Sequence, residues 1–148
     1  MSGPPAQLPP PTSPALLPAL AAITYVAAIV AFWGVLSLVL NRDPVDYPDA
    51  GPLLGPAMAV GGGLVTWLVL WRARGTVARA LLALFGSYLA MLVVVGAGYT
   101  ITRGDVSWMI VAPAHFAISP FVAGAAVLAV LTTLAATALA RGVARDNR

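Results

Sequence analysis

The chain has 148 residues, of which 60% are hydrophobic and only 9% are charged. Soluble domains carry about 25% charged residues, so 8 arginines and 5 aspartates are too few to cover a water-facing surface. The absence of cysteine excludes disulfides, thiolate-bound iron–sulfur clusters and cysteine-ligated zinc. The formal charge of +3 comes from scattered arginines without an arginine–aromatic stripe, so nucleic acid is not an expected partner. The composition therefore indicates an integral membrane protein.

Residues 1–15 form a segment that is rich in proline and has no charged side chain. The segment lacks the basic start of a secretory signal peptide, and the apolar run that follows it is too long for one. We expect a disordered cytoplasmic tail here, and a polyproline recognition segment is the alternative interpretation.

Four apolar stretches are long enough to cross a bilayer, whose hydrocarbon core of about 30 Å requires about 20 helical residues. They cover residues 17–40, 53–71, 80–102 and 120–140, and none of them contains Asp, Arg or His. We therefore predict an all-α fold, in which residues 16–140 form an integral membrane bundle of four transmembrane helices with short loops. Residues 141–148 would then be a basic cytoplasmic tail.

The stretch before the fourth span has two interpretations. Residues 108–140 are 33 residues without Asp or Arg, and one continuous helix of this length would measure about 50 Å. Ser119 followed by Pro120 favours a new helix start, because Ser is a good N-cap and Pro suits the first helical position. We expect residues 108–119 to be an interfacial or re-entrant segment, and the alternative is one long helix kinked at Pro120.

The distribution of arginine predicts the orientation in the membrane. Six arginines lie between spans two and three or after span four: Arg72, Arg74, Arg79, Arg141, Arg145 and Arg148. The other side has two arginines and four aspartates: Arg42, Arg103, Asp43, Asp46, Asp49 and Asp105. We therefore predict that both termini are cytoplasmic. Four aromatic residues near the span ends are expected at the membrane–water interface: Trp33, Tyr47, Trp71 and Trp108.

Small residues at helical spacing predict where the spans pack, because helices in lipid associate largely through close backbone approach. The candidates are Gly55, Ala59 and Gly63 in the second span, Gly86 and Ala90 in the third, and Ala125, Ala129 and Thr133 in the fourth. The three consecutive glycines at 61–63 indicate a bend or a very close contact. These faces fit neighbouring helices of the same chain, a homo-oligomer or a larger membrane complex.

The spans offer hydroxyl groups but no charged side chain, which argues against proton relays and ion-coupled transport. We expect the threonines to bond back to their own helices, whereas Tyr25, Tyr88 and Tyr99 are candidates to line a polar cavity. His115, the single histidine, is a candidate metal ligand or pH-sensitive group. A metal needs three or four converging ligands, so we expect no metal site and no cofactor. No catalytic motif is present, and we expect no enzymatic activity.

In size, number of spans and arginine-only, alanine-rich composition, the chain resembles uncharacterised small four-span membrane proteins of high-GC bacteria. The resemblance covers the whole chain and implies a multi-pass protein of the bacterial plasma membrane, but it assigns no functional residue. Two functions remain in competition. The first is a non-catalytic structural or accessory subunit that packs through small-residue helix faces, and the second is a small oligomeric channel or transporter for a weakly charged solute.

Overall fold

The computed structural model describes residues 15–45 and 51–146 of the chain. The described residues form five α-helices and no strand: α1 (Leu16–Leu40), α2 (Leu54–Arg72), α3 (Thr76–Arg103), α4 (Trp108–Phe116) and α5 (Pro120–Asp146). The predictions made for residues 1–14, Asp46, Tyr47, Asp49 and Arg148 lie outside the described residues.

Four of these helices, α1, α2, α3 and α5, are long and apolar enough to cross a membrane. This finding confirms the predicted all-α membrane bundle of four spans. Two helices extend by several residues beyond their predicted spans: α3 begins at Thr76, and α5 continues past Arg141 to Asp146. The prediction stopped each span at the first charged residue, whereas a helix ends where its backbone hydrogen bonds end. The 27 residues of α5 measure about 40 Å, which exceeds a hydrocarbon core of about 30 Å.

Residues with positive φ lie between α1 and α2, between α2 and α3, and between α3 and α4. Asn41 follows α1 with φ 49°, and its N–H donates to the carbonyl oxygen of Ser37, as in common helix C-caps. Gly75 has φ 85° in the turn between α2 and α3, and Gly104 ends α3 with φ 65°. Glycine adopts these angles without the steric cost that a Cβ would add.

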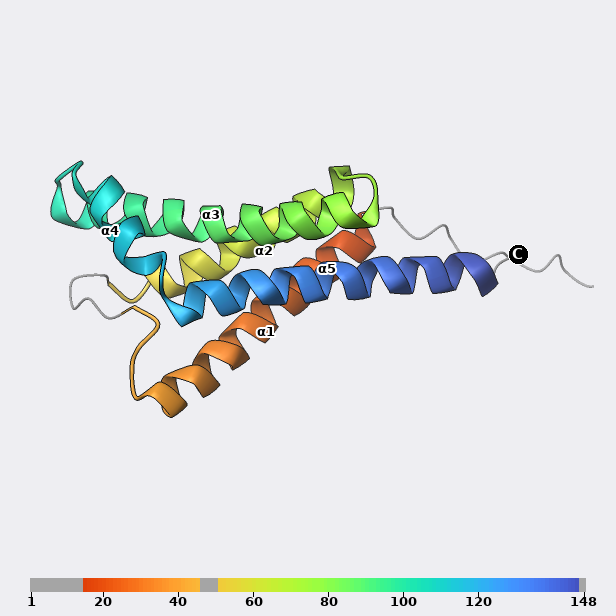
Figure 1. Ribbon diagram of the computed structural model, residues 1–148, viewed down its shortest axis with the longest axis horizontal. Helices are drawn as coiled ribbons and strands as arrows, with labels where there is room; N and C mark the ends of the chain where they lie inside the picture. Colours follow the sequence, from red (N-terminus) through yellow and green to blue (C-terminus); the bar gives the residue numbers. More distant parts are fainter. Residues whose placement is uncertain (1–14, 46–50, 147–148) are drawn as a thin grey trace, which may run out of the picture.

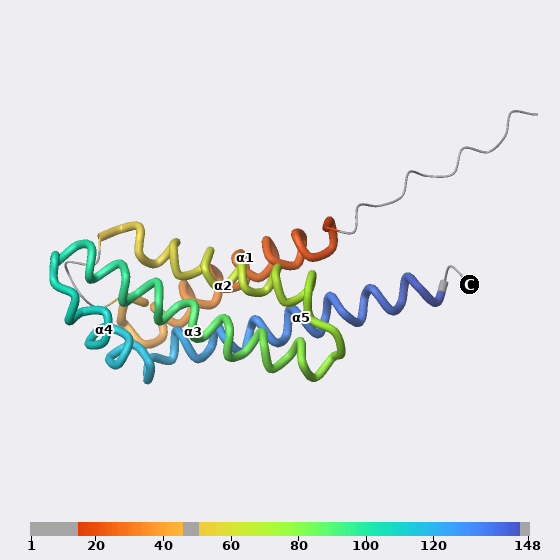
Figure 2. Tube along the Cα trace, turned by 90° about the horizontal axis from the view of Figure 1, so that it is seen from above, coloured from red at the N-terminus to blue at the C-terminus, as the bar shows by residue number. Residues whose placement is uncertain are grey.

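The long helices form an elongated antiparallel bundle (Figure 1). α2 and α3 make a tight hairpin through residues 73–75, α5 packs against α3, and α1 packs against α2 and α5. In Figure 1, α1 runs obliquely to the other helices, and Figure 2 shows that α3 and α5 lie side by side along most of their length. The start of α1, the α2–α3 turn and the end of α5 share one end of the bundle, which we call the terminal end. The opposite end, which we call the loop end, contains residues 41–45 and α4.

The short helix α4 folds back along the last turns of α3 at the loop end (Figure 1). Gly96 permits this contact, because a Cβ there would lie 3.0 Å from both the Met109 carbonyl oxygen and Pro113 Cγ. The helix ends at Phe116, whose carbonyl oxygen accepts a hydrogen bond from the Ser119 N–H at 3.0 Å, and α5 starts at Pro120. α4 and α5 are therefore two helices separated by residues 117–119, instead of one continuous helix.

Candidate functional site

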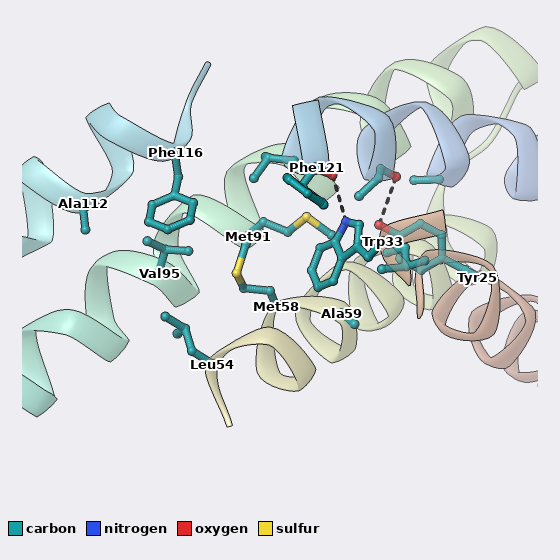
Figure 3. Close-up of a cluster of buried hydrophobic side chains, with 14 of the residues drawn as sticks. Tyr25, Trp33, Leu54, Met58, Ala59, Met91, Val95, Ala112, Phe116 and Phe121 are labelled. Carbon is teal, nitrogen blue, oxygen red and sulfur yellow. Dashed lines mark hydrogen bonds between the residues drawn. The ribbon is translucent and has the colours of Figure 1, made fainter. Parts of the chain in front are cut away.

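The middle of the bundle is organised around Tyr25, a fully buried residue of α1. Its hydroxyl donates to the carbonyl oxygen of Ala125 on α5 at 3.2 Å, as the dashed line in Figure 3 shows. Ser87 of α3 lies beside the same hydroxyl, and Gly62 of α2 faces it. One phenol side chain of α1 therefore contacts the three other spans at one level of the bundle.

The three consecutive glycines of α2 form close contacts with two different helices. A Cβ at Gly61 would lie 3.2 Å from Val94 of α3, and a Cβ at Gly62 would lie 2.5 Å from the Tyr25 hydroxyl oxygen. A Cβ at Gly63 would lie 2.8 Å from Val26 Cγ2 of α1. Of the two predicted interpretations of this run, close contact is therefore the one that the structure supports directly.

Trp33 is buried inside the bundle, so its ring does not lie on the outer surface, where an aromatic residue at the interface was expected to contact headgroups. Only 6% of Trp33 is exposed, and its indole Nε1–H donates to the carbonyl oxygen of Phe121 at 3.0 Å (Figure 3). The first turn of α5 offers this acceptor within the core, and a buried indole N–H needs such a partner. By contrast, Trp71 at the terminal end is 54% exposed.

Tyr88 stabilises the break between α4 and α5. Its hydroxyl donates to the carbonyl oxygen of Ala117 at 2.8 Å. Ala117 follows the last residue of α4, and Pro120 has no N–H that could donate to a preceding carbonyl. A side-chain donor is therefore well placed here, because an unpaired carbonyl inside a membrane is costly.

Tyr99 belongs to an aromatic cluster where α3 meets α4. Its fully buried ring lies 5.8 Å from the ring of Trp108 and 6.2 Å from the ring of Phe116. The guanidinium of Arg103 lies 3.9 Å from the centre of the Trp108 ring, a distance typical of a cation–π interaction. The three tyrosines therefore lie in different surroundings. The Tyr25 hydroxyl binds the Ala125 carbonyl and the Tyr88 hydroxyl binds the Ala117 carbonyl, whereas Tyr99 packs where α3 meets α4.

The turn that leads into α4 contains an exposed carboxylate with a local partner. The Oδ1 atom of Asp105 accepts a hydrogen bond from the Ser107 N–H at 2.8 Å. This bond favours the ionised carboxylate, and it lowers the pKa of Asp105 below the ordinary value of an aspartate.

The small residues predicted to pack helices lie in different surroundings. The three candidates on α5 are fully buried: Ala125, Ala129 and Thr133. Ala59 of α2 is 2% exposed. A Cβ at Gly86 of α3 would lie 2.8 Å from Val65 Cγ1 of α2, and Ala90 is half-buried. Gly55 differs from these residues, because a Cβ there would meet no atom within 4 Å.

Most threonines of the spans bond to their own helices, as predicted. Their Oγ1 atoms donate to the carbonyl oxygen four residues earlier, at distances of 2.7–3.1 Å: Thr24, Thr66, Thr102, Thr132 and Thr137. These hydroxyls therefore serve the backbone of the helix that carries them.

His115 borders a small cavity of about 120 Å³ at the loop end, which we call the polar notch. Its polar lining consists of Arg42, Asp43, His115 and Ser119. The imidazole also packs edge-on against Phe116, with ring centres 5.6 Å apart. Among residues 15–45 and 51–146, no three His, Asp or Glu side chains lie close enough together to hold a metal ion.

A long apolar groove, which we call the α1–α2 groove, lies between α1 and α2. It consists of two cavities of about 520 Å³ each, and both are lined by Val26 and Val60. The first cavity is at the loop end, where Asp43 and Gly55 line it, and the second extends to Trp67. The first cavity and the polar notch both include Asp43, so the groove and the notch meet at this residue.

The sequence did not predict three features of the site: the groove, the tyrosine–carbonyl bonds and the Arg103–Trp108 contact. The positions of glycine and alanine at 55, 59, 63 and 27 carry a signal for the groove, because small side chains on facing helices leave space. The hydrogen bonds of Tyr25 and Tyr88 leave no such signal, because their acceptors are backbone carbonyls that every residue has.

Residues 14–148, which are most of the chain, match the model of one protein family. No curated protein and no solved structure matches the chain. The family is described as one of unknown function, so it adds no substrate or partner, in agreement with the resemblance to uncharacterised proteins. The chain belongs to DUF6121, a family of unknown function.

Proposed function

We propose that this protein is a non-catalytic structural or accessory subunit of a larger membrane complex. The observation that carries the proposal is the use of buried polar groups for packing. The Tyr25 hydroxyl and the Trp33 indole N–H each donate to a backbone carbonyl of α5, so they hold α1 against α5. A bundle built in this way is suited to a fixed shape.

The composition of the core supports the same proposal. Proton relays and ion pathways usually depend on ionisable residues inside the membrane. Among the described residues, no acidic or basic residue is buried, and the buried polar side chains besides Tyr25, Tyr99 and Trp33 are hydroxyls: Thr66, Ser87, Thr133 and Thr137. Two of the four, Thr66 and Thr137, bond to their own helices, and Ser87 lies beside Tyr25.

α1 offers the largest surface to a partner among the four spans. Only 17% of its most apolar stretch is buried, compared with 28% for α3 and 39% for α2 and α5. Large apolar side chains cover its outer surface near the loop end, where Val35 is 62%, Leu38 84% and Val39 75% exposed. In a complex, this helix has the most surface left for another subunit.

We also propose that the protein lies in a bacterial plasma membrane with both termini in the cytoplasm. Five arginines lie close to the α2–α3 turn or in the last turns of α5, and both of these regions are at the terminal end in Figure 1: Arg72, Arg74, Arg79, Arg141 and Arg145. Arg141 hydrogen-bonds the Thr76 hydroxyl, and Arg79 Nε donates to the Ala73 carbonyl oxygen at 2.9 Å. An excess of arginine on one side is typical of the cytoplasmic side.

Single-cysteine labelling tests the orientation, since the natural chain contains no cysteine. Val106→Cys lies at the loop end, where Val106 is 76% exposed, and Gly142→Cys lies near the C-terminus, where a Cβ meets no atom within 4 Å. We expect a membrane-impermeant maleimide to label Val106→Cys in intact cells and Gly142→Cys only after lysis. The reverse pattern would contradict the proposed orientation.

Native mass spectrometry tests the role itself. The tagged protein is purified from its own membranes in mild detergent, and an unrelated tagged four-span protein serves as the control. We expect one or more other membrane subunits at a defined stoichiometry. Two results together would overturn the proposal and favour the channel. One is a homo-oligomer without a partner, and the other is a solute flux across liposome membranes that changes in the Tyr25→Phe variant.

A further inference from the structure

The α1–α2 groove has the form of a binding site for a single amphiphilic molecule. Its two cavities of about 520 Å³ each fall within the range of about 300–1,000 Å³ that ligand pockets occupy. The walls are almost entirely apolar along α1 and α2, with Val26 and Val60 common to both cavities. Both helices are membrane spans, so the groove opens toward hydrocarbon, and an acyl chain matches its chemistry.

The groove is polar only at its loop end. Asp43 lines both the first cavity and the polar notch, and Arg42, His115 and Ser119 complete the polar part of the notch. A molecule with its chain in the groove would therefore place its headgroup beside Asp43 and Arg42, the charged lining residues of the described part of the chain. This juxtaposition gives the groove an orientation, because the polar part of the occupant must lie at the loop end.

Among the residues that the structure describes, the charged side chains at the mouth are Asp43 and Arg42, and they distinguish between headgroups. A guanidinium pairs well with a phosphate, and a carboxylate accepts hydrogen bonds from an ammonium group. Asp43 and Arg42 are adjacent in the chain and carry opposite charges, so they match a headgroup that has both a phosphate and a primary ammonium. A glycerol headgroup has no cation for Asp43, and a choline headgroup has no N–H donor.

We propose that the α1–α2 groove and the polar notch together bind a zwitterionic phospholipid with a primary ammonium headgroup. Its acyl chain lies between α1 and α2, its phosphate lies beside Arg42, and its ammonium lies beside Asp43. This inference is independent of whether the chain joins a larger complex, because the site is formed by one copy of the protein.

The test measures lipid bound to the purified, delipidated protein in detergent micelles. Equal amounts of ethanolamine, choline and glycerol phospholipids with identical acyl chains are added, and native mass spectrometry counts the adducts. Since one hydrogen bond to a charged group contributes about 1 kcal/mol or more, we expect the ethanolamine lipid to bind about fivefold more than either competitor. Equal binding of the three lipids would overturn the proposal.

Two sets of variants separate the headgroup from the chain. Asp43→Asn should remove the preference for ethanolamine over choline, whereas Asp105→Asn, at the same end of the bundle, should keep it. Val60→Trp, which fills the groove from an exposed position, should reduce the binding of all three lipids about fivefold or more. Leu89→Trp on α3 is the matched control, because Leu89 is similarly exposed and does not line the groove.

Ala27→Leu fills the same groove from α1 and provides a second test if Val60→Trp does not fold, as judged by circular dichroism. Unchanged lipid binding in a folded groove variant would overturn the proposal. A dimer that binds no lipid and dissociates on groove filling would also overturn it, and would show that a second copy occupies the groove.

Discussion

Gly62 is the position at which one added methyl group tests the packing around Tyr25 most directly. A Cβ there would lie 2.5 Å from the Tyr25 hydroxyl oxygen, 2.9 Å from Tyr25 Cε1 and 3.1 Å from Met91 Cε. Tyr25 is fully buried and bonded to the carbonyl oxygen of Ala125, so its ring cannot move aside without losing that bond. We therefore predict that Gly62→Ala destabilises the bundle.

The magnitude follows from three contributions. Overpacking in a filled core costs about 1–3 kcal/mol, and loss of an interhelical hydrogen bond in a membrane costs about 0.6–1.7 kcal/mol. Alanine is favoured over glycine in a helix by about 1 kcal/mol, which offsets part of this loss. The expected net destabilisation of Gly62→Ala is about 1–4 kcal/mol. Gly55→Ala is the control, because its Cβ meets no atom within 4 Å and only the last contribution applies.

The assay is equilibrium unfolding in mixed detergent micelles with increasing dodecyl sulfate, followed by circular dichroism. A double-mutant cycle with Tyr25→Phe isolates the contact, because this change removes both the nearest oxygen atom and the hydrogen bond. We expect Gly62→Ala to cost about 1 kcal/mol less in the Tyr25→Phe background. The reasoning would be refuted if Gly62→Ala matched the stability of Gly55→Ala, or if its cost were the same in both backgrounds.

Three further predictions concern the loop end. Tyr88→Phe removes the donor to the Ala117 carbonyl, and we expect a loss of about 0.6–1.7 kcal/mol with faster hydrogen exchange at residues 117–121; unchanged exchange would contradict this role. Arg103→Gln removes the cation above the Trp108 ring and should cost about 0.5–1 kcal/mol in the same unfolding assay. A variant as stable as the parent would show that this contact contributes nothing. The pKa of Asp105 is lowered by its bond to Ser107, so the stabilisation of the turn should be present above the ordinary aspartate pKa and disappear as the pH falls through the lowered value. An NMR titration should give a midpoint below that of an ordinary aspartate, and Ser107→Pro, which removes the N–H donor, should raise it; an unshifted midpoint in the parent protein would refute the assignment.

The features that depend on local sequence could be predicted. Each of the four spans is an uninterrupted apolar stretch, and the Ser119–Pro120 pair marks the beginning of α5, because both signals act within a few residues. The helix ends were less accurate, since the first turn of α3 and the last turns of α5 contain arginines that the hydropathy pattern excludes from a span.

The features that depend on facing helices could not be predicted. Trp33 has the sequence position of an interfacial residue, but the carbonyl of Phe121 lies within reach in the core and accepts its N–H. The fold-back of α4 depends on the space left by Gly96, and the groove depends on how α1 lies against α2 (Figure 1). Relations of this kind arise from three-dimensional packing. Small residues in the sequence indicate where two helices face each other, but not whether the helices touch there or leave a groove.

The position of Tyr25 has a consequence for the order in which the helices assemble. The surroundings of its hydroxyl are formed by Gly62 of α2, Ser87 of α3 and Ala125 of α5. These surroundings are complete only when those three helices have met. We therefore expect α1 to dock last, after α5 has arrived, although α1 precedes the other three spans in the chain. Until then the nascent chain would hold a tyrosine hydroxyl in the membrane without its final acceptor, and the early intermediate would be the state most exposed to degradation.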